Sequence, residues 1–155
     1  MIEVFIGYGG ARAENVANDL CLFLRNDVEL HVFLASPTST SLQPTVDWRV
    51  EINESLMNCN IAVFVCHEGT PSSYEVRREI KFLFDNNQEH KIISFATHKS
   101  CIPKKLRNRW SPYHFPPEKP EESFCRLLNQ IYRSYVRNSH RTLLIREDER
   151  ERMEE

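Results

Sequence analysis

Several features are missing from the sequence, and each absence excludes a class of protein. There is no basic excess, because 20 Lys and Arg stand against 22 Asp and Glu and leave a net charge of -2, so direct binding to nucleic acid is not expected. No apolar run approaches the roughly 18 residues of a membrane-spanning helix. The N-terminal MIEVFIGYGG has no basic region followed by an apolar core and a cleavage site, so we expect the chain neither to enter nor to cross a membrane.

Disulfide and metal frameworks are missing as well. The five cysteines are odd in number and widely spaced, without a CxxC pair, which indicates a reduced, cytoplasmic location. They are Cys21, Cys59, Cys66, Cys101 and Cys125. Neither the cysteines nor the histidines have the spacing of metal ligands, so no metal site is expected.

What is present is an alternation of short apolar strands and amphipathic helices, over a length typical of one domain. The pattern predicts strands at residues 2–7, 29–35, 60–66 and 91–97, with room for a short fifth strand around residues 113–115. It predicts helices at residues 13–24, 46–58 and 121–137, and another within 70–84. Such an alternation implies an α/β fold: a flavodoxin-like three-layer sandwich with a four- or five-stranded parallel sheet in the order 2-1-3-4-5.

The composition changes beyond Asn138, where REDERERMEE is almost entirely charged and has no apolar face to bury. We interpret residues 139–155 as a charged tail, either a solvated helix or a linker, with an interaction tail as the alternative.

In a parallel sheet of this order, ligands bind outside the carboxyl ends of the strands. The loops that follow Ile6, Leu34 and Val65 therefore form the candidate site. The first of them, IGYGGAR, resembles a phosphate-binding turn, because glycine lets backbone amides approach an anion at a helix N-terminus. Neither GxxxxGK nor GxGxxG is present, however, and a plain tight turn is the alternative.

The third loop leads into a helix that carries a carboxylate in an unusual place. In TPSSYEVRREIKFLF, Glu79 falls at the edge of the apolar stripe of the helix. That stripe consists of Val76, Ile80, Leu83 and Phe84. Desolvation at its border would raise the pKa of Glu79 and suit the group to a cationic or hydroxyl-bearing ligand. The alternative is a salt bridge to Arg49, Arg77 or Arg78.

Two serines and two aromatic residues complete the candidate site. Ser72 lies almost two turns before Glu79 on the same face of the helix, and Ser73 faces slightly to the side. Each serine either lines a pocket with Glu79 or caps the helix. Tyr8 and Trp48 are available to stack on a flat ligand, although Trp48 also suits the core.

With these elements in place, residues 2 to 137 resemble a TIR domain, of the Toll/interleukin-1 receptor/resistance family. VFIGYGG, with the helix VANDLCLFL after it, is similar to the first box of the family. VFLASPTSTSLQPTVDWRVEINESLMNCNIAVFV is similar to the second strand, BB loop, helix B and third strand. SSYEVRREI resembles the third element, in which a serine precedes a glutamate of helix C by six residues.

The resemblance implies an enzyme of the prokaryotic, NAD-cleaving type. Such a NAD+ nucleosidase breaks the nicotinamide-ribosyl bond and releases nicotinamide plus ADP-ribose or a cyclic isomer, so NAD is a substrate and no cofactor is implied. Glu79 then matches the catalytic glutamate of the family. Ser73 matches the serine that helps position the ribose, with Ser72 beside it.

The remaining substrate contacts follow from the same resemblance. Tyr8 or Trp48 would stack on a ring of NAD, and Gly9, Gly10 and Arg12 would face the diphosphate.

Some positions depart from the family pattern, and two other functions stay open. Gly7 stands where the family usually has serine, Glu75 and Val76 replace a common WC pair, and no glycine precedes Trp48 in the BB loop. The first alternative is a non-enzymatic TIR interaction module that works through its BB loop and helix surfaces. The second is an enzyme like the nucleoside deoxyribosyltransferases, which share the fold and use a glutamate on N-glycosidic bonds.

The resemblance also implies partners. TIR domains often assemble so that one BB loop completes the site of a neighbour, and we expect self-association through TIR–TIR contacts. With a TIR-like domain at residues 1–138 and a charged tail or linker at 139–155, we expect a further sensor or oligomerising domain after the tail, in immune or cell-death signalling.

Overall fold

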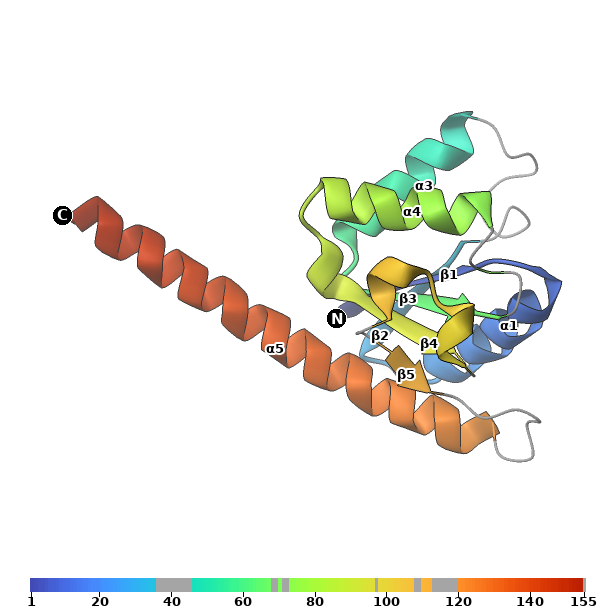
Figure 1. Ribbon diagram of the computed structural model, residues 1–155. Coiled ribbons are helices and arrows are strands. Elements are labelled where there is room, and N and C mark those ends of the chain that lie inside the picture. Colours follow the sequence, from blue (N-terminus) through green and yellow to red (C-terminus); the bar gives the residue numbers. More distant parts are fainter. Residues whose placement is uncertain are drawn as a thin grey trace.

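Five strands form one parallel sheet in the computed structural model (Figure 1). They are β1 (Ile2–Tyr8), β2 (Leu30–Leu34), β3 (Ile61–Cys66), β4 (Ile92–Ala96) and β5 (Trp110–Pro112). Their order across the sheet is β2-β1-β3-β4-β5, which confirms the predicted flavodoxin-like topology. The structure describes residues 1–35, 46–67, 70, 73–96, 98–107, 110–112 and 120–154.

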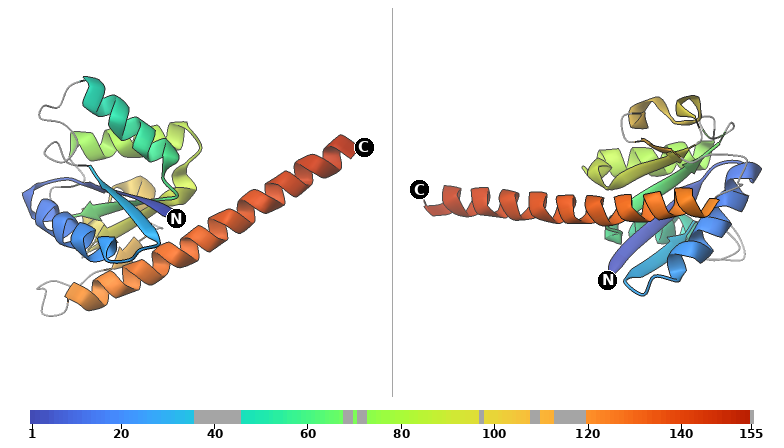
Figure 2. Two further views of the ribbon diagram at one scale, coloured as in Figure 1. Left: turned by 180° about the vertical axis from the view of Figure 1, so that it is seen from behind. Right: turned by 90° about the horizontal axis from the view of Figure 1, so that it is seen from below.

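Helices cover both faces of the sheet and complete the three layers (Figures 1 and 2). The helices are α1 (Ala11–Arg25), α3 (Val46–Asn58), α4 (Tyr74–Asp85) and α5 (Pro120–Glu154). Short 3-10 turns are η2 (Glu89–Lys91), η3 (Lys99–Cys101) and η4 (Lys104–Leu106). Helices α1 and α5 lie on one face, and α3 and α4 lie on the other.

The strands are apolar without interruption because each of their faces meets a helical layer. In β3 every residue is buried. Alternate side chains point to opposite faces of a strand, so Ile61, Val63 and Val65 join the core under α1 and α5. Ala62, Phe64 and Cys66 join the core under α3 and α4. The sheet therefore separates two cores.

Gly7 is explained by the packing of the second of these cores. A Cβ atom added at Gly7 would lie 2.8 Å from two ring atoms of Phe64 on the neighbouring strand and 3.2 Å from the ring of Phe5. The serine that TIR domains usually carry at this position would therefore collide with an aromatic ring that the core holds in place.

The fifth strand differs in position from the expectation. It runs from Trp110 to Pro112 and pairs with β4 through Ser94, Phe95 and Ala96, slightly before the expected residues 113–115, which lie outside the described part of the chain. A strand that ends in proline suits the edge of a sheet, because proline has no N–H to donate to a further strand.

The last helix is much longer than the predicted residues 121–137. Helix α5 continues to Glu154 without a break and projects away from the sheet (Figures 1 and 2). Asn138 makes a late contact with the domain, donating from Nδ2 to the carbonyl of His90 at 3.3 Å, and residues 139–153 are exposed. The division at residue 138 stays a prediction. In the described residues no helix is both long and apolar enough to span a membrane.

Candidate functional site

The loops that follow β1 and β3 are joined by one buried side chain. Thr70 is fully buried and donates from Oγ1 to the carbonyl oxygen of Gly9 at 2.9 Å. The same hydroxyl oxygen accepts the backbone N–H of His67 at 2.7 Å. Because the bond to Gly9 is buried, it holds the two loops together at the carboxyl edge of the sheet, while the bond from His67 fixes Thr70 within its own loop.

Gly9 and Ser73 approach each other so closely that only glycine fits at residue 9. An added Cβ would lie 2.7 Å from Cβ of Ser73, 2.8 Å from its Oγ and 3.1 Å from Val76. Ser73 itself is the N-cap of α4, and its Oγ accepts the N–H of Val76 at 3.5 Å. The structure thus brings two predicted site residues together and gives Ser73 the capping role that was one of its two alternatives.

The other predicted residues of the first loop lie further from α4. Gly10 has φ of 95° and directly precedes α1, a backbone conformation that favours glycine, and Arg12 is exposed in the first turn of that helix. Tyr8 is half-buried and packs against the core under α1 and α5, on the opposite side of the sheet from α4. Trp48 lies on α3, but its side chain, like all of Ser72, is outside the described part of the structure.

Glu79 is the most unusual residue of the site. Its side chain is 3% exposed, between the buried Val76 and Ile80 of α4. Its Oε2 atom is buried without a hydrogen-bond partner. Desolvation raises the pKa of Glu79 to about 8, an effect that the positive charge of Arg78 opposes and the negative charge of Glu75 reinforces. The carboxyl group therefore holds a proton at neutral pH.

No salt bridge accounts for Glu79 in the described part of the chain. The neighbouring Arg78 turns instead to Glu75, with 3.4 Å between Nε and Oε2, and donates from Nη1 to Asn53 Oδ1 on α3 at 3.2 Å. Its Nη2 is buried without a partner, as Oε2 of Glu79 is. Consecutive residues of a helix point about 100° apart, and the contacts with Glu75 and Asn53 hold the guanidinium of Arg78 away from the carboxyl group of Glu79.

Two of these contacts were not predicted from the sequence. Thr70 had no signal of its own, because the residue to which it donates, Gly9, lies 61 residues earlier in a different loop. Asn53 pairs with an arginine 25 residues later in the chain. Such contacts depend on how the helices and loops pack, and no local pattern reports them. In the described residues there is also no group of three or more side chains that could hold a metal ion.

Comparisons with known proteins identify the class of fold. No protein family model matches the chain, and no curated protein matches it in sequence. Among solved structures, a prokaryotic SEFIR domain matches with a TM-score of 0.65 at 16% identity, over 85% of this chain and 93% of that one. The TIR domains of the activated Roq1 resistosome, which directly recognises the pathogen effector XopQ, match with a TM-score of 0.63 at 13% identity, over 84% and 99%.

These matches establish a TIR- and SEFIR-like fold, and they confirm the resemblance drawn from the sequence at the level of the fold. Within that fold, the chain places an unpaired, buried glutamate on α4, the helix that follows β3. A fold does not define a reaction, so the chemistry of this chain depends on that glutamate and its surroundings.

Proposed function

We propose that the chain is a NAD glycohydrolase or cyclase of the TIR type, which cleaves the nicotinamide-ribosyl bond to give nicotinamide plus ADP-ribose or a cyclic isomer. The observation that supports this function is the buried Glu79, whose Oε2 has no protein partner. An uncompensated carboxyl group costs stability. A role in ligand binding and chemistry accounts for a buried carboxyl group without a partner. A glutamate kept only for a salt bridge would have a cationic partner.

The raised pKa of Glu79 fits a cationic substrate. The nicotinamide ring of NAD carries a positive charge, and a nearby positive charge favours the ionised form of a carboxyl group. Binding would therefore lower the pKa of Glu79 from about 8 and release its proton. The resulting carboxylate would hold the ribose hydroxyls and stabilise the oxocarbenium-like charge that develops as the bond breaks. Nicotinamide leaves as a neutral base, so no strong general acid is required.

The positions of Ser73 and Gly9 indicate how NAD would be oriented in the site. Ser73, the N-cap of α4, precedes Glu79 by six residues, an axial rise of about 9 Å, and Gly9 packs directly against Ser73. We propose that the ribose lies near Glu79 and the diphosphate extends toward the glycine loop and the N-terminus of α1, where Gly10 and Arg12 stand.

Access to Glu79 requires a rearrangement, because the side chain is only 3% exposed in the single chain. We propose that self-association supplies it, so that the site opens when one copy packs against the next. An immune or cell-death sensor that brings copies together would then switch the activity on. The dependence on assembly would make the activity of dilute protein low.

The test is nicotinamide release from NAD at high protein concentration with a molecular crowder, for the wild type and Glu79→Gln. This substitution keeps the volume of the side chain and removes its ability to ionise. Release by the wild type alone is the expected result. Comparable release by the variant would exclude Glu79 from the chemistry, and release of base from nucleosides without NAD cleavage would indicate a deoxyribosyltransferase-like enzyme.

A second candidate function is supported by the low exposure of the Glu79 side chain. A carboxyl group that is 3% exposed also suits a non-enzymatic TIR-like module, in which α4 is a structural helix and partners bind on the outer surfaces. In that case neither protein would release nicotinamide once assembly has been verified by light scattering.

A further inference from the structure

A pocket between α4 and the segment that contains η4 is lined by cations. Its volume is about 460 Å³, within the range of roughly 300–1,000 Å³ that is typical of small-molecule sites. Five basic side chains line it: Arg77, Lys81, Lys104, Lys105 and Arg107. Among the described residues that line it, none is acidic. Five of the 20 basic residues of a chain with a net charge of -2 thus line one pocket.

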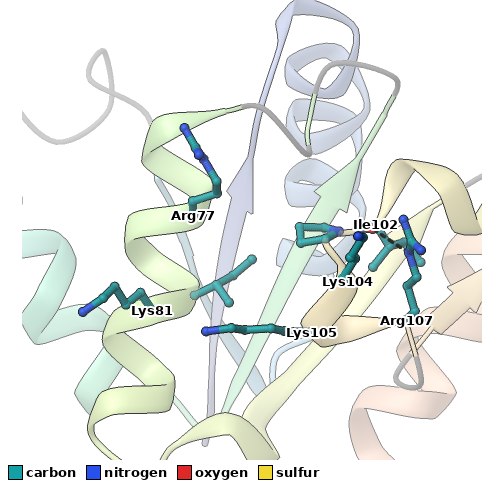
Figure 3. A pocket seen from close by; sticks show the side chains of 8 residues that line it. Arg77, Lys81, Ile102, Lys104, Lys105 and Arg107 are labelled. Carbon is teal, nitrogen blue, oxygen red and sulfur yellow. Dashed lines mark hydrogen bonds between the residues drawn. The ribbon is translucent and has the colours of Figure 1, made fainter.

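The two walls of the pocket come from distant parts of the sequence. Figure 3 shows Arg77 and Lys81 on α4, with Lys81 pointing away from the opposite wall, and Lys105 reaching toward that helix from the opposite wall. The ammonium group of Lys105 lies 5.4 Å from the centre of the Phe84 ring, and Arg107 donates from Nε to the carbonyl of Ile102 at 3.2 Å. These contacts position the cations without neutralising them.

The protein itself neutralises the charges of these basic side chains only slightly. Lys81 pairs with Asp85 at 2.9 Å, and both groups are exposed, where such pairs are weak. Arg77 donates from Nε to the carbonyl of Ser73 at 3.4 Å, which leaves its charge in place. Like charges gathered in a concave site repel one another and attract a counter-anion, so the cluster favours binding of a multiply charged anion.

The base of the pocket is apolar. Ile80 and Ile102 are buried, Pro103 is half-buried, and all three line the cavity. A simple inorganic anion would gain nothing from this surface, whereas a ring or sugar attached to phosphate groups would cover it. The combination of an apolar base and a cationic rim therefore fits a ligand with an organic part and a phosphate part.

We propose that this pocket binds a free, nucleotide-sized ligand with two or more phosphate groups. The pocket is separate from the site proposed for NAD cleavage. Arg77, Ile80 and Lys81 are spaced i, i+3, i+4 and share one side of α4. Glu79 does not line the pocket, and its neighbour Arg78 reaches Asn53 of α3. A ligand here would bind α4 and the η4 segment together without entering the glutamate site.

The experiment is calorimetric titration of the full chain with ADP, inorganic tripolyphosphate and adenosine. The test variant is Lys104→Glu/Lys105→Glu. The control is Arg150→Glu/Arg152→Glu, which makes the same change of charge on the exposed end of α5. We expect ADP to bind the wild type more tightly than tripolyphosphate, because only ADP covers the apolar base of the pocket, and we expect adenosine not to bind. We expect at least about a tenfold loss of affinity in the test variant and no loss in the control.

A single substitution on the opposite wall keeps the test valid if the double variant folds poorly. Arg77→Gln removes one charge from α4 and should weaken ADP binding by roughly threefold, since an exposed cation contributes modestly. Raising the salt concentration to about 0.3 M should weaken binding further, because the charges are accessible to solvent.

Three results would overturn the proposal. The first is no binding of ADP by the wild type. The second is equal weakening in the two double variants, which would show a general effect of charge. The third is binding to phosphatidylserine vesicles that is lost in Lys104→Glu/Lys105→Glu while ADP does not bind, which would identify the cations as a lipid-binding surface.

Discussion

Replacing Glu79 with glutamine should remove a pH dependence of stability that this one residue imposes. The pKa of Glu79 rises on folding from its ordinary value of 4.5 to about 8, chiefly because the group is desolvated. Between these values the folded protein keeps a proton that the unfolded chain has lost. The stabilising effect of that proton is complete below pH 4.5 and disappears as the pH rises through 8, at up to about 1.4 kcal/mol per pH unit.

The size of the effect follows from these two pKa values. Glu79 should lower the free energy of unfolding by roughly 2 to 3 kcal/mol between pH 5 and pH 7, and by roughly 1 kcal/mol more by pH 9. Glutamine does not titrate, so Glu79→Gln lacks this dependence. Its buried amide is also short of partners, but that cost is the same at every pH and cancels when two pH values are compared.

The assay is urea unfolding of the wild type and Glu79→Gln at pH 5, 7 and 9. The difference in the free energy of unfolding between variant and wild type should grow with pH by the amounts given above. The control is Glu54→Gln, which removes an exposed carboxylate from α3. Parallel pH profiles for the wild type and Glu79→Gln would refute the reasoning, because they would mean that Glu79 is solvated or paired in solution.

Three further predictions follow. If the Glu79 carboxylate is the active form in NAD cleavage, kcat/KM should rise about tenfold per pH unit below pH 8 and level off above it, and a flat profile from pH 6 to 9 would contradict this role. Gly9→Ala should destabilise the fold by about 1–3 kcal/mol, as overpacked sites do, because its Cβ would lie 2.7 Å from Ser73; an unchanged urea midpoint would disprove the close contact. Removing residues 139–155 should change the free energy of unfolding by less than about 0.5 kcal/mol, since residues 139–153 are exposed. A larger loss of stability, measured by urea unfolding, would show that the end of α5 packs against the domain.

Much of the fold could be predicted because local patterns report burial. The continuous apolar run of β3, Ile61–Cys66, is what a strand covered on both faces requires. Helix α3 has the predicted bounds, Val46–Asn58. The end of α5 was not predictable in the same way, because its last residues bury nothing, and an exposed helix has no apolar period that would distinguish it from a linker.

The candidate site was predictable only in part. Glu79 is nearly inaccessible, as its place at the edge of an apolar stripe predicted, because helical periodicity fixes which face a residue occupies. The same periodicity could not show whether an arginine would reach it. That depended on α3, where Asn53 accepts a hydrogen bond from Arg78 and draws its guanidinium away from Glu79.

By itself, the sequence determined the order of strands and helices, the parallel sheet and the burial of Glu79, since these follow from spacings of a few residues. Tertiary structure decided which distant groups meet. It joined Thr70 to Gly9, set Phe64 against Gly7, and assembled the cationic pocket from α4 and the segment around η4. Such contacts form only when separate elements pack into one volume, and the exact distances between side chains there depend on the whole packed core.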